Sequence, residues 1–252
     1  MNASARPPQM TDTVSFGYEQ VAPAEKTARV GAVFASVARR YDLMNDLMSA
    51  GLHRGWKDEF VRMVKPRPGE QILDMAGGTG DIAFRMAAAG SHVTVADINS
   101  AMLEVGIERA AKRGLTGLVW QEQNAETLSA PNASYDAYTI AFGIRNVTDI
   151  PAALREAHRV LRWGGRFFCL EFSTTEWPGF GKIYDQYSEK LVPQIGKYVA
   201  KDEASYRYLI ESIRRFPPMS AFAAMIEVAG LARVASRPIL GGLVAIHSGW
   251  KV

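Results

Sequence analysis

Hydrophobic and polar positions alternate in two ways along the middle of the chain. Short apolar runs, typical of strands buried on both faces, are separated by segments whose apolar residues recur every three or four positions, as in helices. The runs predict strands over residues 71–74, 92–97, 118–121, 135–142 and 166–170, and the periodic segments predict helices over residues 81–89, 100–113 and 150–161. Alternating strands and helices indicate an α/β fold with a doubly wound sheet. Asp149 is a suitable N-cap for the third helix, and Gly164-Gly165 is expected to end it.

The segments on either side of this core have other patterns. Residues 1–25 contain Pro7, Pro8 and Pro23 and show no periodicity, so we expect a flexible tail. Within residues 26–65, apolar positions recur at helical spacing, which predicts an N-terminal helical cap made of one amphipathic helix or a bent pair, packed in the core or lying over an apolar ligand. Residues 174–229 are expected to form a helical insertion on the substrate side, after the fifth strand, and the following 20 or so residues to supply two closing strands. Residues 26–252 are therefore expected to form a single domain.

Composition and charge narrow the class of protein. The 252 residues are 48% hydrophobic and 22% charged, which is ordinary for a globular domain and excludes a disordered chain. A net charge of +3, with both signs interspersed, is compatible with an anionic membrane surface or nucleic acid and indicates neither. The single cysteine, Cys169, excludes an internal disulfide and a cysteine-based metal cluster, and no metal site is expected. With no transmembrane segment and no signal sequence recognisable, the sequence favours a cytoplasmic location.

The candidate chemistry begins with the loop Asp74-Met75-Ala76-Gly77-Gly78-Thr79-Gly80-Asp81, at the end of the first predicted strand. In doubly wound sheets ligands bind at the carboxyl ends of the strands. The spacing of Gly78, Gly80 and Ala83 also fits a dinucleotide fingerprint, so an NAD(P)-dependent oxidoreductase is one alternative. The carboxylates of Asp74 and Asp81 would repel a pyrophosphate at this helix N-terminus. S-adenosylmethionine (SAM) carries an ammonium and a sulfonium instead, so the loop suits SAM better.

Two further positions fit the same cofactor. Asp97 ends the next strand, where its carboxylate can accept both ribose hydroxyls, although it could also be a helix N-cap. Asn124 and Ala125 follow the third strand, where a side-chain amide and a backbone N–H can bind the adenine edge, although Asn124 could also be a simple turn residue.

These motifs resemble those of the ubiquinone/menaquinone biosynthesis C-methyltransferases, the UbiE family. The resemblance rests on residues 74–81, 96–99, 124–126 and 142–147, together with 41–46, Trp56-Lys57, 205–209 and His247. It implies a class I SAM-dependent methyltransferase fold, Rossmann-like with seven strands, and transfer of a methyl group to a ring carbon of a polyprenylated benzoquinol or a demethylmenaquinol. It places cofactor contacts at Thr79, Asp97, Asn124 and Ala125. Ala141 departs from the pattern, because some members have a serine there that contacts the cofactor.

The expected reaction asks for few groups besides the cofactor. A quinol hydroxyl near pKa 10 is mostly neutral at pH 7, so the site must favour the phenolate that activates the ring carbon. Arg145 can stabilise the anion directly or through a water, and Asn146 can orient the same oxygen. Tyr41 and His53, from the N-terminal helices, are candidates for relaying a proton.

The substrate implies partners, and the residues leave alternatives. A prenylated acceptor implies peripheral contact with the inner face of the cytoplasmic membrane, and an assembly with other quinone-biosynthesis enzymes is possible. A nucleic-acid methyltransferase is disfavoured because Phe142-Gly143-Ile144-Arg145 stands where an Asn/Asp-Pro-Pro-aromatic motif is needed, and Cys169 follows Phe168 rather than proline. An O- or N-methyltransferase of small molecules and a quinol carrier without turnover remain open.

Overall fold

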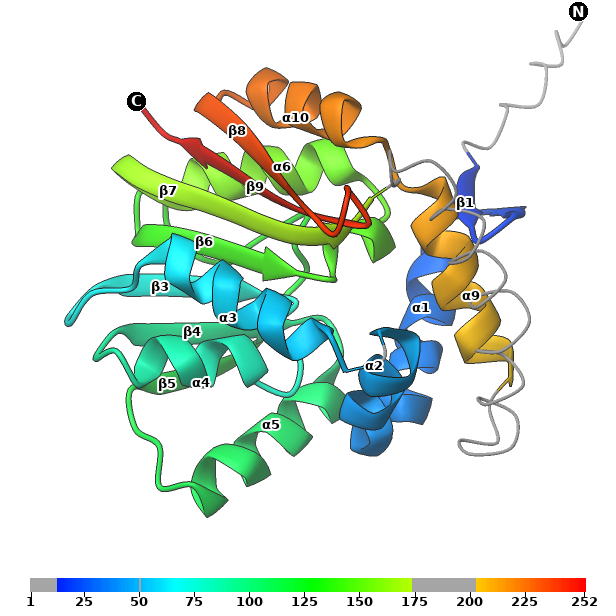
Figure 1. Ribbon diagram of the computed structural model, residues 1–252, viewed down its shortest axis with the longest axis horizontal. Coiled ribbons are helices and arrows are strands. Elements are labelled where there is room, and N and C mark those ends of the chain that lie inside the picture. The colour runs from blue at the N-terminus through cyan, green and yellow to red at the C-terminus, as the bar shows by residue number, and fades with distance from the viewer. Residues whose placement is uncertain (1–12, 50, 174–202) are drawn as a thin grey trace, which may run out of the picture.

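The centre of the protein is a seven-stranded sheet in the order β5-β4-β3-β6-β7-β9-β8 (Figure 1). We describe it from a computed structural model, which describes residues 13–49, 51–173 and 203–252. The strands are β3 (Gln71–Met75), β4 (His92–Asp97), β5 (Leu118–Glu122), β6 (Tyr135–Ala141), β7 (Leu161–Phe172), β8 (Ala232–Ile239) and β9 (Val244–Trp250). Strands β3 to β7 pair in parallel, whereas β9 is antiparallel to both of its neighbours. The predicted doubly wound, seven-stranded sheet is therefore confirmed.

Helices cover both faces of this sheet because its strands are apolar on both sides. Along β7, Phe167 and Cys169 belong to one core cluster, and Phe168 and Leu170 to the other. The first cluster is closed by α6 (Ile150–Val160) and α10 (Met219–Val228), and the second by α3 (His53–Val64), α4 (Asp81–Ala87) and α5 (Ser100–Lys112). Two helices assigned by sequence to the N-terminal cap and the insertion, α3 and α10, thus pack on the sheet instead.

The remaining helices stand at the end of the sheet where β3, β4 and β6 finish (Figure 1). They are α1 (Pro23–Val37), a 3₁₀ turn η1 (Ala38–Arg40), α2 (Tyr41–Ser49) and α9 (Glu203–Arg215). Buried residues of α1 and α2 form a third core cluster with Tyr208, Leu209 and Ile210 of α9. The apolar spacing from Val30 to Met48 therefore belongs to a bent helix pair, one of the two forms predicted.

A short hairpin precedes these helices. β1 (Val14–Phe16) pairs with β2 (Glu19–Val21), and the Phe16 ring stacks on Tyr208 at a centroid distance of 4.2 Å. The expectation of a loose tail is thus wrong for residues 14–25, whose contacts are with a helix almost two hundred residues away along the chain. Residues 1–12 of that tail, and residues 174–202 of the expected insertion, lie outside the described residues.

One predicted boundary is also wrong. Helix α6 ends at Val160, and Gly164-Gly165 lies within β7 rather than closing the helix. The Lys251 ammonium donates to the Leu161 carbonyl at 2.8 Å, and the Gly164 N–H donates to the Lys251 carbonyl at 2.7 Å. Leu161 also pairs with Tyr135 of β6. These contacts from distant parts of the chain extend the strand backwards through the glycines.

Neither a helix that could cross a membrane nor a metal-binding cluster occurs in the described ranges. None of the helices there combines the length and the apolar character that a membrane crossing requires. The same ranges hold no group of three or more His, Cys, Asp or Glu side chains placed to bind a metal ion.

Candidate active site

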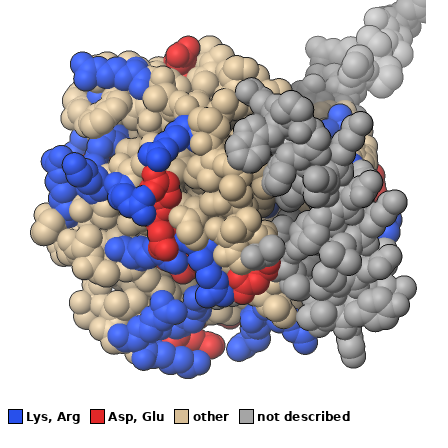
Figure 2. Space-filling view, in the orientation of Figure 1, with Lys and Arg blue, Asp and Glu red and all other residues tan. Residues whose placement is uncertain are grey.

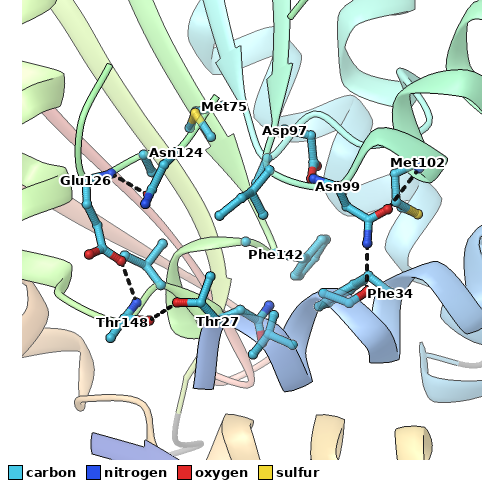
Figure 3. A pocket seen from close by; sticks show the side chains of 18 of the residues that line it. Thr27, Phe34, Met75, Asp97, Asn99, Met102, Asn124, Glu126, Phe142 and Thr148 are labelled. Atoms are coloured by element: carbon cyan, nitrogen blue, oxygen red, sulfur yellow. Dashed lines mark hydrogen bonds between the residues drawn. The ribbon is translucent and has the colours of Figure 1, made fainter. Parts of the chain in front are cut away.

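Two adjoining cavities lie at the carboxyl ends of β3, β4 and β6. The α1 cavity is bounded by α1, the ends of β3 and β4, and residues 124–126, 142–143 and 146–148 (Figure 3). The glycine-loop cavity is bounded by Lys57, the segment from Asp74 to Asp81, and Ala141. Both cavities are lined by Tyr41, Ala76 and Phe142, so these three residues mark the place where they meet. An elongated ligand lying across both would have its middle at this junction.

The glycine loop brings bare backbone close to the strands. A Cβ atom on Gly77 would lie 2.6 Å from the Val95 side chain and 2.9 Å from the Asp74 carbonyl oxygen, so a side chain there would displace the loop. Gly78 and Gly80 have φ of +53° and +83°, a backbone region that favours glycine. The sequence motif therefore corresponds to a closely packed backbone loop that can hold a ligand at the end of β3.

Asp97 lies between the loop and α5. Its carboxylate accepts the Gly78 N–H at 3.0 Å and the Asn99 N–H at 2.9 Å, and burial raises its pKa to about 6. The N-cap of α5 is Asn99, whose side chain accepts from the Met102 N–H at 3.2 Å, so Asp97 does not act as the cap. Asp97 lines the α1 cavity, as a ribose-binding carboxylate would.

Asp74 is buried at the floor of the glycine-loop cavity. One carboxylate oxygen accepts from the Thr139 hydroxyl at 2.7 Å, and the other has no hydrogen-bond partner among the described residues. Burial raises the pKa of Asp74 to about 7. A buried oxygen without a partner is costly, so this atom is ready to accept a donor from a ligand.

Asp81, by contrast, is fully paired. Burial by itself raises its pKa, but the Lys57 ammonium at 2.8 Å and the Arg85 guanidinium at 2.5 Å outweigh burial and hold that pKa well below its usual range. Its negative charge is therefore compensated within the protein. The repulsion of phosphate that the sequence attributed to Asp81 is weaker than expected, and that part of the argument against NAD does not hold.

The remaining cofactor candidates are also placed around the cavities. Asn124 and Ala125 line the α1 cavity, where the Asn124 side chain accepts the Glu126 N–H at 2.9 Å (Figure 3). Asn124 is thus both a turn residue and a wall residue. Thr79 lines the glycine-loop cavity, with its hydroxyl accepting from Arg109 at 2.7 Å.

Helix α1 is held over the α1 cavity by polar contacts that the sequence analysis missed. The Asn99 side chain donates to the Gly31 carbonyl at 2.8 Å, and the hydroxyls of Thr27 and Thr148 are 3.1 Å apart (Figure 3). The Lys26 ammonium donates to the Val147 carbonyl at 2.8 Å, and burial lowers the pKa of Lys26. Lys26 stands four residues before Val30, on the apolar stripe of the predicted helix, and this spacing was the available sequence signal for the contact.

Of the three catalytic candidates, two lie on the cavity walls. Tyr41 stands at the junction of the cavities, and Asn146 lines the α1 cavity with its side-chain oxygen accepting from the Tyr208 hydroxyl at 3.0 Å. Burial raises the pKa of Tyr41, and the Arg145 cation opposes that shift. Asn146 is thereby connected to α9, and Tyr41 lies within the field of Arg145.

Arg145 lies in a buried ion pair, so the direct contact with the acceptor that the sequence analysis allowed is not what the structure shows. Its side chain is 4% exposed and pairs with Glu171, itself 0% exposed, at 2.6 Å. The guanidinium also donates to the Phe142 carbonyl at 2.8 Å. Neither cavity has Arg145 among the described residues that line it. Sequence reasoning missed Glu171, although a carboxylate near the end of a wholly apolar strand was a usable signal.

His53 has a structural environment. Its Nδ1 lies 3.0 Å from the Ser49 hydroxyl, and burial, reinforced by the nearby Lys57 cation, lowers the pKa of His53 to about 4. It borders a surface groove rather than either cavity. A neutral histidine at the junction of α2 and α3 fits a structural role better than proton relay.

Comparison with known proteins gives a consistent picture. Residues 22–251 match the ubiE/COQ5 methyltransferase family. The chain is 64% identical over 241 residues to a protein of Zymomonas mobilis named ubiquinone/menaquinone biosynthesis C-methyltransferase UbiE, covering 96% of this chain and all of that one. A protein of the same name from Methylobacterium nodulans is 57% identical over 246 residues, 95% of this chain and 97% of that one.

Solved structures share the fold at low sequence identity. A SAM-dependent methyltransferase from Aquifex aeolicus aligns with a TM-score of 0.61 at 15% identity, covering 86% of this chain and 98% of that one. Phosphoethanolamine N-methyltransferase 2 of Haemonchus contortus, in complex with S-adenosyl-L-methionine, aligns with a TM-score of 0.59 at 12% identity, covering 78% of this chain and 52% of that one. These likenesses establish a class I methyltransferase fold.

Proposed function

Because the chain belongs to the ubiE/COQ5 methyltransferase family, it is a SAM-dependent C-methyltransferase of quinone biosynthesis, and we propose that it methylates a ring carbon of a polyprenylated benzoquinol or a demethylmenaquinol. The observation that carries this proposal is the 64% identity to the Zymomonas mobilis protein over that protein's whole length. The name of that relative covers both ubiquinone and menaquinone biosynthesis, so both acceptors are included in the test.

The two cavities fit the parts of SAM. Asp97 can accept the ribose hydroxyls, and Asn124 with Ala125 can bind the adenine edge in the α1 cavity. In the glycine-loop cavity, the unpartnered oxygen of Asp74 can accept the amino group of the cofactor. Bound there, SAM supplies an electrophilic methyl group on a sulfonium. The junction lined by Tyr41 and Phe142 is the part of the site between these two sets of contacts.

The protein's own contribution is to orient the acceptor and favour its anion. We propose that Tyr41 and Asn146 contact the quinol hydroxyl whose deprotonation makes the neighbouring ring carbon nucleophilic. Arg145 would then act on the same oxygen through its positive charge, because its effect in lowering the pKa of Tyr41 exceeds the opposing effect of its partner Glu171. Glu171 fixes the guanidinium, so the cation is preorganised and needs no rearrangement during the reaction. Apolar walls from Val30, Phe34 and Phe142 limit water, and much of the rate enhancement then comes from alignment.

Product analysis tests the acceptor. The purified protein is incubated with methyl-labelled SAM and short-chain quinols of both classes under reducing conditions, and the products are identified by mass spectrometry. We expect a label on a ring carbon. A label on oxygen or nitrogen would support a small-molecule O- or N-methyltransferase, and quinol binding without transfer would support a carrier. Equilibrium titration with NADH separates the remaining alternative, and we expect binding of SAM alone.

Asn146→Ala and Tyr41→Phe are the variants for the acceptor site. Both residues lie on the walls, so each variant is expected to lower kcat by about 10- to 1000-fold, the range for losing a positioned proton-transfer or orienting group. Thr148→Val, on the same wall but directed at Thr27, is the matched control and should stay within a few-fold of the wild type. Full activity in both site variants would remove them from the acceptor site.

We also propose peripheral membrane association through the end of the molecule that carries η1 and α9. Arg39 and Arg40 are exposed on η1, next to the exposed Leu43. Phe216, which follows Arg214 and Arg215 along the chain, is buried against Phe222 and takes no part in this surface. We expect weak, salt-sensitive binding to anionic vesicles.

A charge-matched control is available on another surface. Figure 2 shows Lys and Arg side chains gathered over the lower part of the face drawn, where Figure 1 has α4 and α5, and Lys112 and Arg113 are exposed at the end of α5. Arg39→Gln/Arg40→Gln is expected to reduce flotation with anionic liposomes, and Lys112→Gln/Arg113→Gln to leave it unchanged. If instead Lys112→Gln/Arg113→Gln reduces flotation and Arg39→Gln/Arg40→Gln leaves it unchanged, the membrane contact lies at α5.

Association with other quinone-biosynthesis enzymes stays a prediction, which crosslinking in cells would test.

A further inference from the structure

A buried lysine stands on the wall of the glycine-loop cavity, opposite in charge to the carboxylates there. Lys57 lies on α3, on the face that carries Trp56 and Phe60 into the sheet core, and its side chain is 5% exposed. Its ammonium has three hydrogens to donate, and Asp81 is its hydrogen-bond partner among the described residues. A cation without its full set of acceptors is costly to bury, so a second acceptor at this cavity would stabilise it.

Asp74 supplies the second, independent observation. It is 1% exposed, and its Oδ2 has no hydrogen-bond partner among the described residues. This oxygen faces the glycine loop, because a Cβ built on Gly77 would lie 3.1 Å from it. Lys57 and Asp74 line the same cavity. The cavity thus presents a cation at Lys57 and an anion at Asp74, each with unused hydrogen-bonding capacity.

A ligand that complements this pair carries an anion and a cation a short distance apart. The α-amino acid end of SAM has that chemistry, with a carboxylate and an ammonium on the same carbon. If Asp74 accepts the ammonium, the carboxylate needs a donor elsewhere in the lining of the same cavity, and Lys57 is a cation there. The remaining charges do not compete for it, because Arg85 binds the far side of Asp81 and does not line this cavity.

We propose that Lys57 binds the α-carboxylate of SAM, and that Asp81 is a positioning residue that holds the Lys57 ammonium at the cavity wall. The pairing of Asp81 with Arg85 then contributes to this positioning. It keeps Asp81 anionic and fixed, so that Asp81 orients Lys57 from its own place on the cavity wall. The proposal rests on the cofactor of the family and not on the quinol acceptor, so its test needs no methyl transfer.

Binding of SAM and of decarboxylated SAM, measured by calorimetry on the full chain, tests this assignment. Decarboxylated SAM retains the amino group, the sulfonium and the adenosine and lacks only the carboxylate. We expect the wild type to bind SAM about 10- to 100-fold more tightly than the decarboxylated form, the range for one charge-assisted hydrogen bond. In Lys57→Met, SAM affinity should fall to that of decarboxylated SAM, whose own affinity should stay within about twofold. Lys57→Arg keeps the charge and should keep part of the preference.

Arg85→Met is the matched control. It removes the other cation bound to Asp81 and leaves the cavity wall intact, so the preference for SAM should persist. Equal affinities for both compounds in the wild type would overturn the proposal, and so would equal losses for both compounds in Lys57→Met. If Lys57→Met fails to fold, the wild-type comparison and Lys57→Arg decide. The outcome of the quinol assay is independent of these results, so failure here leaves the proposed acceptor in place.

Discussion

The buried pair of Arg145 and Glu171 gives the most demanding prediction. Glu171 accepts from the Arg145 guanidinium at 2.6 Å and from the Phe172 N–H at 2.9 Å, and neither side chain has appreciable contact with solvent. Arg145 also donates to the Phe142 carbonyl at 2.8 Å and lies over the Phe172 ring at 5.6 Å. Replacing Glu171 by Gln keeps the shape of the side chain and removes its charge, leaving a buried guanidinium without its counter-ion.

The expected loss of unfolding free energy follows from leaving this guanidinium buried without a counter-ion. Removing one partner of a buried ion pair costs about 3–5 kcal/mol of unfolding free energy. The Gln side chain can still accept one hydrogen bond from Arg145, so we expect Glu171→Gln to fall near the lower end, about 3 kcal/mol. Arg145→Met should cost a similar amount. The double variant leaves no buried charge, so its cost should be smaller than the sum of the two by about 2 kcal/mol or more.

Urea unfolding followed by tryptophan fluorescence measures these free energies, with Trp56 about 6.0 Å from the Phe172 ring as a local probe. Arg162→Met is the control, because its pair with Asp136 is partly exposed and should contribute about 1 kcal/mol or less. Additive costs in the double variant, or a loss below about 1 kcal/mol in Glu171→Gln, would refute the reasoning. The proposed catalytic role adds a second readout, because Arg145→Lys should lower kcat while SAM affinity stays close to the wild type.

Three further predictions concern the cofactor. Asp97→Asn should weaken SAM binding by about 1.5–3 kcal/mol in calorimetry, through loss of charge-assisted hydrogen bonds, and unchanged affinity would remove it from the ribose site. Burial raises the pKa of Asp74 to about 7 and of Asp97 to about 6 from the ordinary 3.8, so their contribution to stability is present below about pH 4 and is lost as pH rises through 6 and 7. SAM needs the anions, so its affinity should rise over pH 5.5–8, and Asp74→Asn should flatten the upper part of that profile. Lys26→Met removes the bond to Val147 and should speed SAM dissociation in stopped-flow by about two- to tenfold, whereas an unchanged rate would mean that this bond does not retain α1.

The parallel core was predictable because its signals are local. Strands β3 to β6 begin at the predicted residues and end within one residue of the predicted ends, since each is an apolar run bounded by glycine, aspartate or a polar turn. The sequence could not predict the hairpin at residues 14–21 or the early start of β7, because their partners lie far away in the sequence. Phe16 needs Tyr208 for its stacking, and Leu161 needs Lys251 for its carbonyl. No window of neighbouring residues contains either contact.

The candidate site divides along the same line. The sequence brought Asp97, the glycine loop and Asn124 together as candidates because the carboxyl ends of parallel strands meet at one edge of a sheet, and all of them line the two cavities there. Residue type and position also identified Arg145, but they could not identify its counter-ion. Whether an arginine faces a cavity or a carboxylate depends on how β7 packs beside the 3₁₀ turn η2 (Ile144–Asn146), which sequence spacing does not specify. The same holds for Lys57, which helical periodicity assigns to a buried face without naming its partner.

The position of β9 has a consequence for how the chain reaches this structure. β9 is last along the chain among the described strands, yet it lies between β7 and β8. Until residues 244–250 have been synthesised, one edge of β7 has no partner, and its run from Phe167 to Leu170 is among the most apolar in the protein. An open apolar edge is a template for pairing with other chains. A ribosome-bound chain would therefore expose an aggregation-prone strand edge for the time needed to make about eighty more residues. We expect chaperones to bind the nascent chain mainly in that interval.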